Sequence, residues 1–154
     1  MYRHTSPAYT PLSGDGARRQ GGRWNPPDSF RVVYTALEVE TVDREFARFV
    51  LRAGVTKPSI TRRQLATIRV RLSRVLDLTN EVTRDALGVS EAEITSDDLA
   101  IARAIGEAAH HLGYEAVLAP SGAGRGNVLA IFLDNRAGDS VLEVADARDG
   151  YLPG

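Results

Sequence analysis

The spacing of apolar and polar positions divides the chain into short strands and helices. Residues 31–37 are rich in β-branched and aromatic side chains, which predicts a short buried strand. Residues 65–72 alternate apolar and basic side chains, as a half-exposed strand does, and residues 74–79 are expected to continue that sheet. Further strands are expected at 115–120 and 127–133, with a weaker one at 141–144. Because the strands gather in two parts of the chain, the pattern predicts an α+β fold.

A first long helix is predicted after the strand at 31–37. Thr41 suits its N-cap, and Gly54 suits its end just after Ala53. Its apolar stripe is expected to consist of Val42, Phe46, Phe49, Val50 and Ala53.

Two more helices are predicted further along the chain. Residues 80–89 suit a short helix that ends at Gly88, and residues 95–113 give the clearest helical pattern. In the latter, Thr95 and Asp98 suit a capping box, and Gly113 suits the end. The expected apolar stripe comprises Ile101, Ile105, Ala108 and Leu112.

Residues 5–29 are rich in Gly, Pro and Ser and predict a long ordered loop, which in a compact domain usually has a function. Gly21 and Gly22 permit close approach to a ligand, and two prolines stiffen the exit from the turn. Arg23 and Trp24 are held between them. This arrangement suits an anion-and-ring site. The structural alternative is a plug, with Trp24 in the core and Arg23 bonded to loop carbonyls.

Two other candidates come from the first helix and from a glycine-rich connection. Glu45 lies on the flank of the apolar stripe, so it either faces a cleft or pairs at the surface with Arg48 or Arg52. Ser121 begins a Gly-rich connection between two predicted strands. This segment resembles a phosphate-cradling loop in composition, but it lacks the P-loop ending, and a flexible hairpin is the alternative.

Bulk composition narrows the function classes. The chain has 154 residues, enough for one domain, and a formal net charge of −1, so nothing global suggests nucleic-acid binding. The absence of cysteine excludes disulfides and thiolate metal sites, and three histidines, two of them adjacent, make a His metal site unfavourable. Neither a signal peptide core nor an apolar run of membrane-spanning length occurs, so a cytoplasmic protein without membrane contact is expected.

Several segments, taken in order, resemble the RES-domain family of bacterial toxins. They are residues 2–4 (YRH), 12–27 (LSGDGARRQGGRWNPP), 32–37 (VVYTAL), Glu45 and 119–127 (APSGAGRGN). The ordered set is specific, and it runs through nearly the whole chain. The resemblance implies a single RES domain over 1–154 with an ADP-ribosyltransferase-like fold, in which mostly antiparallel sheets and flanking helices surround an NAD cleft. Because the chain starts almost directly at the first motif, an amino-terminal extension is expected to be missing or removed.

The resemblance also implies an activity and a partner. Family members consume NAD as a substrate by breaking its nicotinamide–ribose bond, without a metal or a resident cofactor, and so deplete cellular NAD and arrest growth. Many are toxins of type II toxin–antitoxin systems, and an Xre-like helix-turn-helix antitoxin covers their cleft. The alternatives are an ADP-ribosyltransferase that modifies a specific macromolecule and a non-catalytic module that binds NAD or a partner. The leading expectation is an NAD glycohydrolase whose acceptor is water or another small nucleophile, while water, phosphate and protein all stay open as acceptors.

The family's motif positions assign roles to residues of this chain. Glu45 is expected to stabilise the developing ribose cation and to hold its 2′-hydroxyl, as glycosidases do. Arg3 and Arg23 are expected to grip the pyrophosphate and the adjoining ribose, which makes these three the catalytic set. The remaining positions are assigned to NAD binding: Tyr34, Ser121, His4, Trp24 and Asn127.

Overall fold

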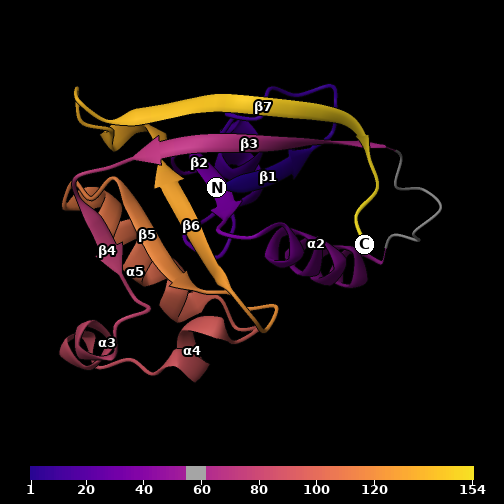
Figure 1. Cartoon of the computed structure of the whole chain (residues 1–154). Coiled ribbons are helices and arrows are strands. Elements are labelled where there is room, and N and C mark those ends of the chain that lie inside the picture. The colour runs from indigo at the N-terminus through magenta and orange to yellow at the C-terminus, as the bar shows by residue number, and fades with distance from the viewer. Residues whose placement is uncertain (55–61) are drawn as a thin grey trace.

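The computed structural model describes residues 1–54 and 62–154 and contains a seven-stranded sheet (Figure 1). The strands are β1 (Tyr2–Thr5), β2 (Val32–Ala36), β3 (Arg63–Arg71), β4 (Val75–Asp77), β5 (Ala116–Pro120), β6 (Asn127–Phe132) and β7 (Val141–Tyr151). Their order in the sheet is β4-β5-β6-β2-β1-β3-β7, and every neighbouring pair is antiparallel except β4 and β5. The predicted α+β fold with mostly antiparallel pairing is confirmed.

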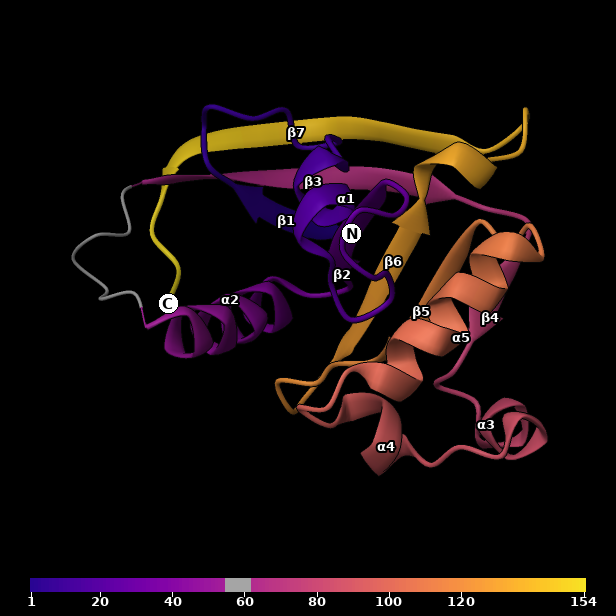
Figure 2. The same cartoon turned by 180° about the vertical axis from the view of Figure 1, so that it is seen from behind.

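Five α-helices accompany the sheet in the described residues. They are α1 (Asp15–Gln20), α2 (Val39–Ala53), α3 (Glu81–Leu87), α4 (Glu91–Thr95) and α5 (Ala100–His111), and a 3-10 turn, η2, covers Leu133–Asn135. Seen from behind, α5 lies across β5, and α2 lies apart from it, next to β1 (Figure 2). The strand direction rotates strongly across the sheet, so β3 and β7 run at a steep angle to β5 and β6 (Figure 2). No helix of the described part of the chain is long and apolar enough to cross a membrane.

The two faces of the central strands carry separate apolar clusters. One cluster joins Trp24, Phe132 and Ile94 to the small inward residues of α5. The other holds Val33, Leu129 and Ile131 against side chains from β3 and β7. Burial on both faces explains why β6 reads as an almost continuous apolar run rather than as an alternating one.

The first long helix begins earlier than predicted. Glu38 occupies the N-cap position, so α2 starts at Val39, and Thr41 lies inside its first turn. The Thr41 hydroxyl donates to Glu38 Oε2 at 2.9 Å instead of capping the helix. Gly54 ends the helix in the left-handed conformation, as expected. Of the predicted stripe, Val50 is buried, whereas Phe49 is 59% exposed because its side of the helix faces a cavity instead of the core.

The start predicted for the last helix is wrong, and its predicted apolar stripe holds only at Ile105, which packs against the core. The predicted helix is divided: α4 ends at Thr95, and α5 starts only at Ala100. The capping box belongs instead to Ser90 and Glu93 of α4. Ile101 and Leu112 are exposed, and the buried positions of α5 are the small residues Ala102, Gly106 and Ala109.

Close packing explains why small residues form that face. A Cβ at Gly106 would collide with the carbonyl oxygen of Trp24, so the loop that follows α1 approaches the backbone of α5 directly. Larger side chains on that face would separate helix and loop.

Some elements are not evident from the pattern. The loop predicted at 5–29 contains the short helix α1, and residues 2–5 form β1, which pairs with both β2 and β3. The weak strand predicted at 141–144 extends to Tyr151.

Candidate active site

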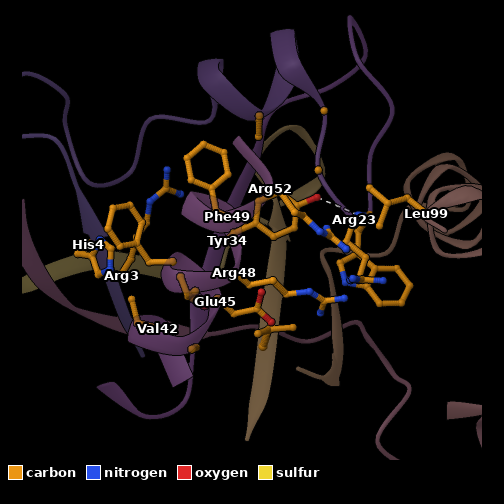
Figure 3. Close-up of a pocket in the computed structure, with 18 of the residues that line it drawn as sticks. Arg3, His4, Arg23, Tyr34, Val42, Glu45, Arg48, Phe49, Arg52 and Leu99 are labelled. Atoms are coloured by element: carbon orange, nitrogen blue, oxygen red, sulfur yellow. Dashed lines mark hydrogen bonds between the residues drawn. The ribbon is translucent and has the colours of Figure 1, made fainter. Parts of the chain in front are cut away.

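A cavity of about 450 Å³ lies between α2, strands β1 and β2, the loop at Gly21–Trp24 and the start of α5 (Figure 3). This volume falls within the roughly 300–1,000 Å³ that is usual for small-molecule sites. Five arginines and one carboxylate line it: Arg3, Arg23, Arg48, Arg52, Arg103 and Glu45. The cavity therefore suits an anionic ligand of small-molecule size.

Glu45 reaches the cavity from the second turn of α2 and is held by a hydroxyl from the Gly-rich connection between β5 and β6. The Ser121 Oγ donates to Glu45 Oε1 at 2.5 Å. The surface alternative, in which Glu45 pairs with Arg48 or Arg52, is wrong, because both arginines bind Asp97. Within the described residues Ser121 is the hydrogen-bond partner found for Glu45, which leaves Oε2 for a ligand.

Ser121 and Asn127 lie at the two ends of the Gly-rich connection, and neither is part of the cavity wall. The Ser121 side chain is buried behind Glu45 and accepts a bond from Ala123 N at 3.1 Å. The Asn127 carbonyl accepts from Leu37 N at 3.1 Å at the start of β6. This geometry favours an indirect role for Ser121 and does not bring Asn127 to the predicted NAD-binding surface.

Arg23 lies on the cavity wall and anchors the loop to α4. Its Nη1 donates to the carbonyl oxygens of Ile94 at 3.0 Å and Ser96 at 2.6 Å. Burial, reinforced by the neighbouring Arg48, lowers the pKa of the Arg23 guanidinium. One nitrogen of Arg23 is thus structural, as the alternative interpretation expected, while the side chain still borders the cavity.

Trp24 is fully buried in the core, so its indole packs as the structural alternative expected, although the residue also borders the cavity. Its backbone N–H donates to the Tyr34 hydroxyl at 2.9 Å, and that hydroxyl donates to Asn25 Oδ1 at 2.7 Å. Burial raises the pKa of Tyr34, which keeps the phenol protonated in this network. The Tyr34 hydroxyl therefore fixes the loop, and its ring forms part of the cavity floor.

Arg3 and His4 lie at the opposite end of the cavity from Arg23 (Figure 3). Arg3 donates through Nη2 to Ser13 O at 3.3 Å, whereas its buried Nη1 finds no partner in the described structure. Burial and the nearby Arg63 lower the pKa of Arg3 to about 10, so it stays charged at neutral pH. A buried guanidinium nitrogen without an acceptor is costly, and a ligand oxygen would satisfy it.

His4 is neutral at physiological pH. Burial, followed by the charges of Arg63 and Arg3, lowers its pKa to about 4. Its Nδ1 accepts from Arg63 Nε at 2.7 Å, which assigns the proton to Nε2. Nε2 is buried without a hydrogen-bond partner and lies 4.0 Å from Asp43 Oδ1. His4 is thus a neutral donor on the cavity wall.

Three cavity arginines are missing from the prediction: Arg48, Arg52 and Arg103. The first two lie three and seven residues after Glu45, a spacing that places all three on one side of a helix and that could have revealed them. Arg103 donates through Nε to Gly22 O at 2.9 Å. No local signal marks Arg103, because its position depends on how closely α5 packs against the loop.

Comparison with known proteins agrees with this architecture. The model of the RES domain family matches residues 1–151. The chain is 38% identical over 150 residues to "NAD(+) phosphorylase MbcT" of Mycobacterium tuberculosis and of Mycobacterium bovis, covering 96% of this chain and 80% of each relative. It superposes with a TM-score of 0.86 and 35% identity on a chain in the crystal structure of the M. tuberculosis MbcT–MbcA toxin–antitoxin complex. That match covers 96% of this chain and 81% of the other.

The family match, the level of identity and the shared fold all extend over nearly the whole chain. They agree with the resemblance drawn from the ordered motifs. The chain belongs to the RES domain family.

Proposed function

We propose that this chain is a single RES domain that acts as an NAD⁺ phosphorylase: it cleaves the nicotinamide–ribose bond of NAD⁺ and transfers the ADP-ribosyl group to inorganic phosphate. The proposal rests on one observation: Glu45 and five arginines line the same cavity. The name of the mycobacterial relatives supports phosphate as the acceptor. Of the acceptors left open by the sequence, phosphate is therefore favoured over water, and phosphorolysis over hydrolysis.

The reaction needs little acid catalysis. The C1–N bond to nicotinamide breaks with its electron pair going to the pyridinium nitrogen, which becomes neutral. A phosphate oxygen then supplies the pair for the new C1–O bond, giving nicotinamide and ADP-ribose 1-phosphate. The protein must stabilise the cationic ribose in the transition state and exclude water from C1.

The cavity residues suit these tasks. The free Oε2 of Glu45 is available to the ribose 2′-hydroxyl and to the developing charge, while Ser121 fixes the orientation of the carboxylate. The free Nη1 of Arg3 suits a pyrophosphate oxygen, and Arg23 suits the adjoining ribose. The floor formed by Tyr34 and the apolar side chains of α2 suits the nicotinamide ring.

The activity is tested with purified protein, NAD⁺ and a phosphate-free buffer. Nicotinamide release is expected only after inorganic phosphate is added, with ADP-ribose 1-phosphate as the product by mass spectrometry and phosphorus NMR. Release without phosphate would indicate hydrolysis. Label transferred from NAD⁺ to a macromolecule would favour an ADP-ribosyltransferase, and NAD⁺ binding without turnover would favour a non-catalytic module.

Glu45 is tested by substitution. Glu45→Ala is expected to abolish NAD⁺ loss, with a decrease of about a thousandfold or more in kcat, while the thermal unfolding midpoint stays within a few degrees. Full NAD⁺ consumption by a folded Glu45→Ala variant would refute the assignment. Glu107→Ala, on the exposed side of α5, is the control and should keep wild-type activity.

A toxin role with an antitoxin partner belongs to the same proposal. The solved relative is part of a toxin–antitoxin complex, which supports a partner protein that covers the cavity, here with an Xre-like helix-turn-helix domain. Induced expression of this chain should arrest growth and lower cellular NAD⁺. Co-expression of a helix-turn-helix protein encoded beside it should restore both, and failure to do so would contradict the pairing.

A further inference from the structure

We infer that Arg48 and Arg52 form an oxyanion subsite beside Glu45 that binds the acceptor phosphate, and that Asp97 occupies this subsite in the ligand-free protein. The inference rests on the proposed phosphorylase activity. It separates the cavity arginines into one group for the acceptor and another for the dinucleotide.

The first observation is the placement of these arginines on α2. Arg48 and Arg52 follow Glu45 at spacings of three and seven residues, so all three project from one side of the helix. Each borders the cavity, and Arg48 lies beside Glu45 (Figure 3). An anion bound here is therefore adjacent to the carboxylate that faces the reacting ribose.

The second observation is that both guanidinium groups converge on one oxygen atom. Arg48 Nη2 and Arg52 Nη2 both donate to Oδ1 of Asp97. The Asp97 side chain is 77% exposed and comes from the connection between α4 and α5. Each guanidinium presents several N–H donors in a planar fork that matches the oxygens of a phosphate, so two such groups converging on one anionic oxygen suit a phosphate. Its exposure makes this carboxylate exchangeable with a stronger anion from solution.

The third observation is unused binding capacity on Arg48. Its Nη1 is buried and has no partner in the described structure, while its Nη2 already serves Asp97 and the Thr95 carbonyl at 3.4 Å. A tetrahedral dianion offers several acceptor oxygens, whereas Asp97 is engaged through one. Phosphate therefore suits this guanidinium better than the carboxylate does.

The fourth observation is the crowding of positive charge. A Cβ at Gly122 would collide with Arg48 Nη1 and would lie 2.7 Å from Arg23 Nη2, so these two guanidinium groups lie side by side over the Gly122 backbone. Like charges so close repel each other, and a bound dianion relieves that repulsion. Glu45 and Asp97 compensate only part of this charge, because burial and the neighbouring arginines outweigh them and lower the pKa of Arg23.

The pyrophosphate of NAD⁺ is the other source of phosphate oxygens in this reaction. Arg3 lies at the far end of the cavity, and its own free Nη1 suits the pyrophosphate. Assigning the acceptor to Arg48 and Arg52 lets both anions bind at once, with Glu45 adjacent to the acceptor.

Steady-state kinetics with phosphate and NAD⁺ varied separately tests the assignment. Arg48→Gln and Arg52→Gln should each raise the KM for phosphate about tenfold or more and leave the KM for NAD⁺ within about twofold. Asp97→Asn removes the competing carboxylate and should lower the KM for phosphate. The controls are Arg69→Gln, from a surface ion pair between β3 and β7, and Asp98→Asn, whose carboxylate accepts from Ala100 N at 3.0 Å instead of from Arg48 or Arg52.

The outcomes separate this inference from the proposed function. An increase in the KM for NAD⁺ alone would place the pyrophosphate at Arg48 and Arg52 and overturn the inference. An unchanged KM for phosphate in both arginine variants, or a raised one in Asp97→Asn, would also overturn it.

A binding measurement makes the test independent of turnover. Inorganic phosphate alone should raise the thermal unfolding midpoint of the wild-type protein, and this shift should be lost in Arg48→Gln but kept in Arg69→Gln. Equal shifts in the two variants would contradict the subsite. Wild-type NAD⁺ loss that is independent of phosphate would instead refute the phosphorylase activity.

Discussion

The hydroxyl of Ser121 donates a 2.5 Å hydrogen bond to Oε1 of Glu45, and this bond joins the Gly-rich connection after β5 to helix α2. Ser121 is buried, and its Oγ also accepts from Ala123 N, which fixes the direction of the hydroxyl. The donor therefore selects one orientation of the carboxylate. Ser121 is a positioning residue for Glu45.

Ser121→Ala is expected to lower kcat for NAD⁺ cleavage about ten- to a hundredfold, with little change in either KM, because the carboxylate loses its fixed orientation. Ser121→Cys keeps a weak donor and should recover part of the rate. Nicotinamide release measured at saturating and limiting NAD⁺ gives the two parameters. A change confined to KM would show that Ser121 contacts the substrate instead.

Arg3→Met should separate binding from stability. The substitution removes a buried charge whose Nη1 has no partner, so the free energy of unfolding should stay the same or rise. The KM for NAD⁺ should rise about tenfold or more, because the pyrophosphate loses a charged donor. Urea unfolding and steady-state kinetics measure the two effects. A large loss of stability with an unchanged KM would assign Arg3 a structural role.

Gly122→Ala should reduce activity strongly. Its Cβ would collide with Arg48 Nη1 and crowd Arg23 Nη2, so both guanidinium groups must leave their positions on the cavity side. We expect a decrease in kcat/KM of about a hundredfold, with the fold retained by circular dichroism. Gly138→Ala is the matched control, because a Cβ there meets no atom within 4 Å. Equal activity in the two variants would argue against a tightly packed arginine pair.

The buried carboxylate of Glu115 should make the free energy of unfolding depend on pH in the acid range. It accepts backbone N–H bonds from Ser73, Arg74 and Ala137 at 2.7, 2.9 and 2.8 Å and a hydroxyl bond from Ser140. Burial alone would raise its pKa, but these four bonds outweigh burial and lower the pKa to about 2 from 4.5. The stabilisation is therefore complete above about pH 4.5 and is lost as the pH falls toward 2.

Glu115→Gln should lower the free energy of unfolding at pH 7 by on the order of 3 kcal/mol, and roughly half of that difference should vanish at pH 3. Urea titrations of both proteins at the two pH values measure it. Glu107→Gln, on the exposed side of α5, should show neither effect. A penalty that does not change with pH would mean that packing, and not ionisation, sets the contribution of Glu115.

The local pattern of apolar and polar residues was sufficient to predict helices with clear end signals and strands that are buried along their whole length. The strands β2, β5 and β6 and the Gly-terminated helices α2 and α3 are close to their predicted ranges. Strand β1 was not predicted, because its four residues are ordered by pairing with β2 and with the distant β3. The stripe of α5 failed for a similar reason: contact with the Trp24 backbone favours small residues over large apolar ones.

The candidate site was predictable where an ordered motif marked it. Arg3, Arg23, Tyr34 and Glu45 meet at one cavity, as expected, although their chemical roles stay predictions. Arg103 enters the wall through tertiary packing that no local spacing encodes.

Helix α2 also fixes the spacing between the carboxylate and two of the arginines of the cavity. Glu45, Arg48 and Arg52 lie on one helix, so the distances between their Cα atoms do not change when other parts of the domain move. At 3.6 residues per turn, inserting one residue after Glu45 would rotate both guanidinium groups by roughly 100° around the helix axis. Length variation among relatives should therefore accumulate in the connections and avoid the segment between positions 45 and 52.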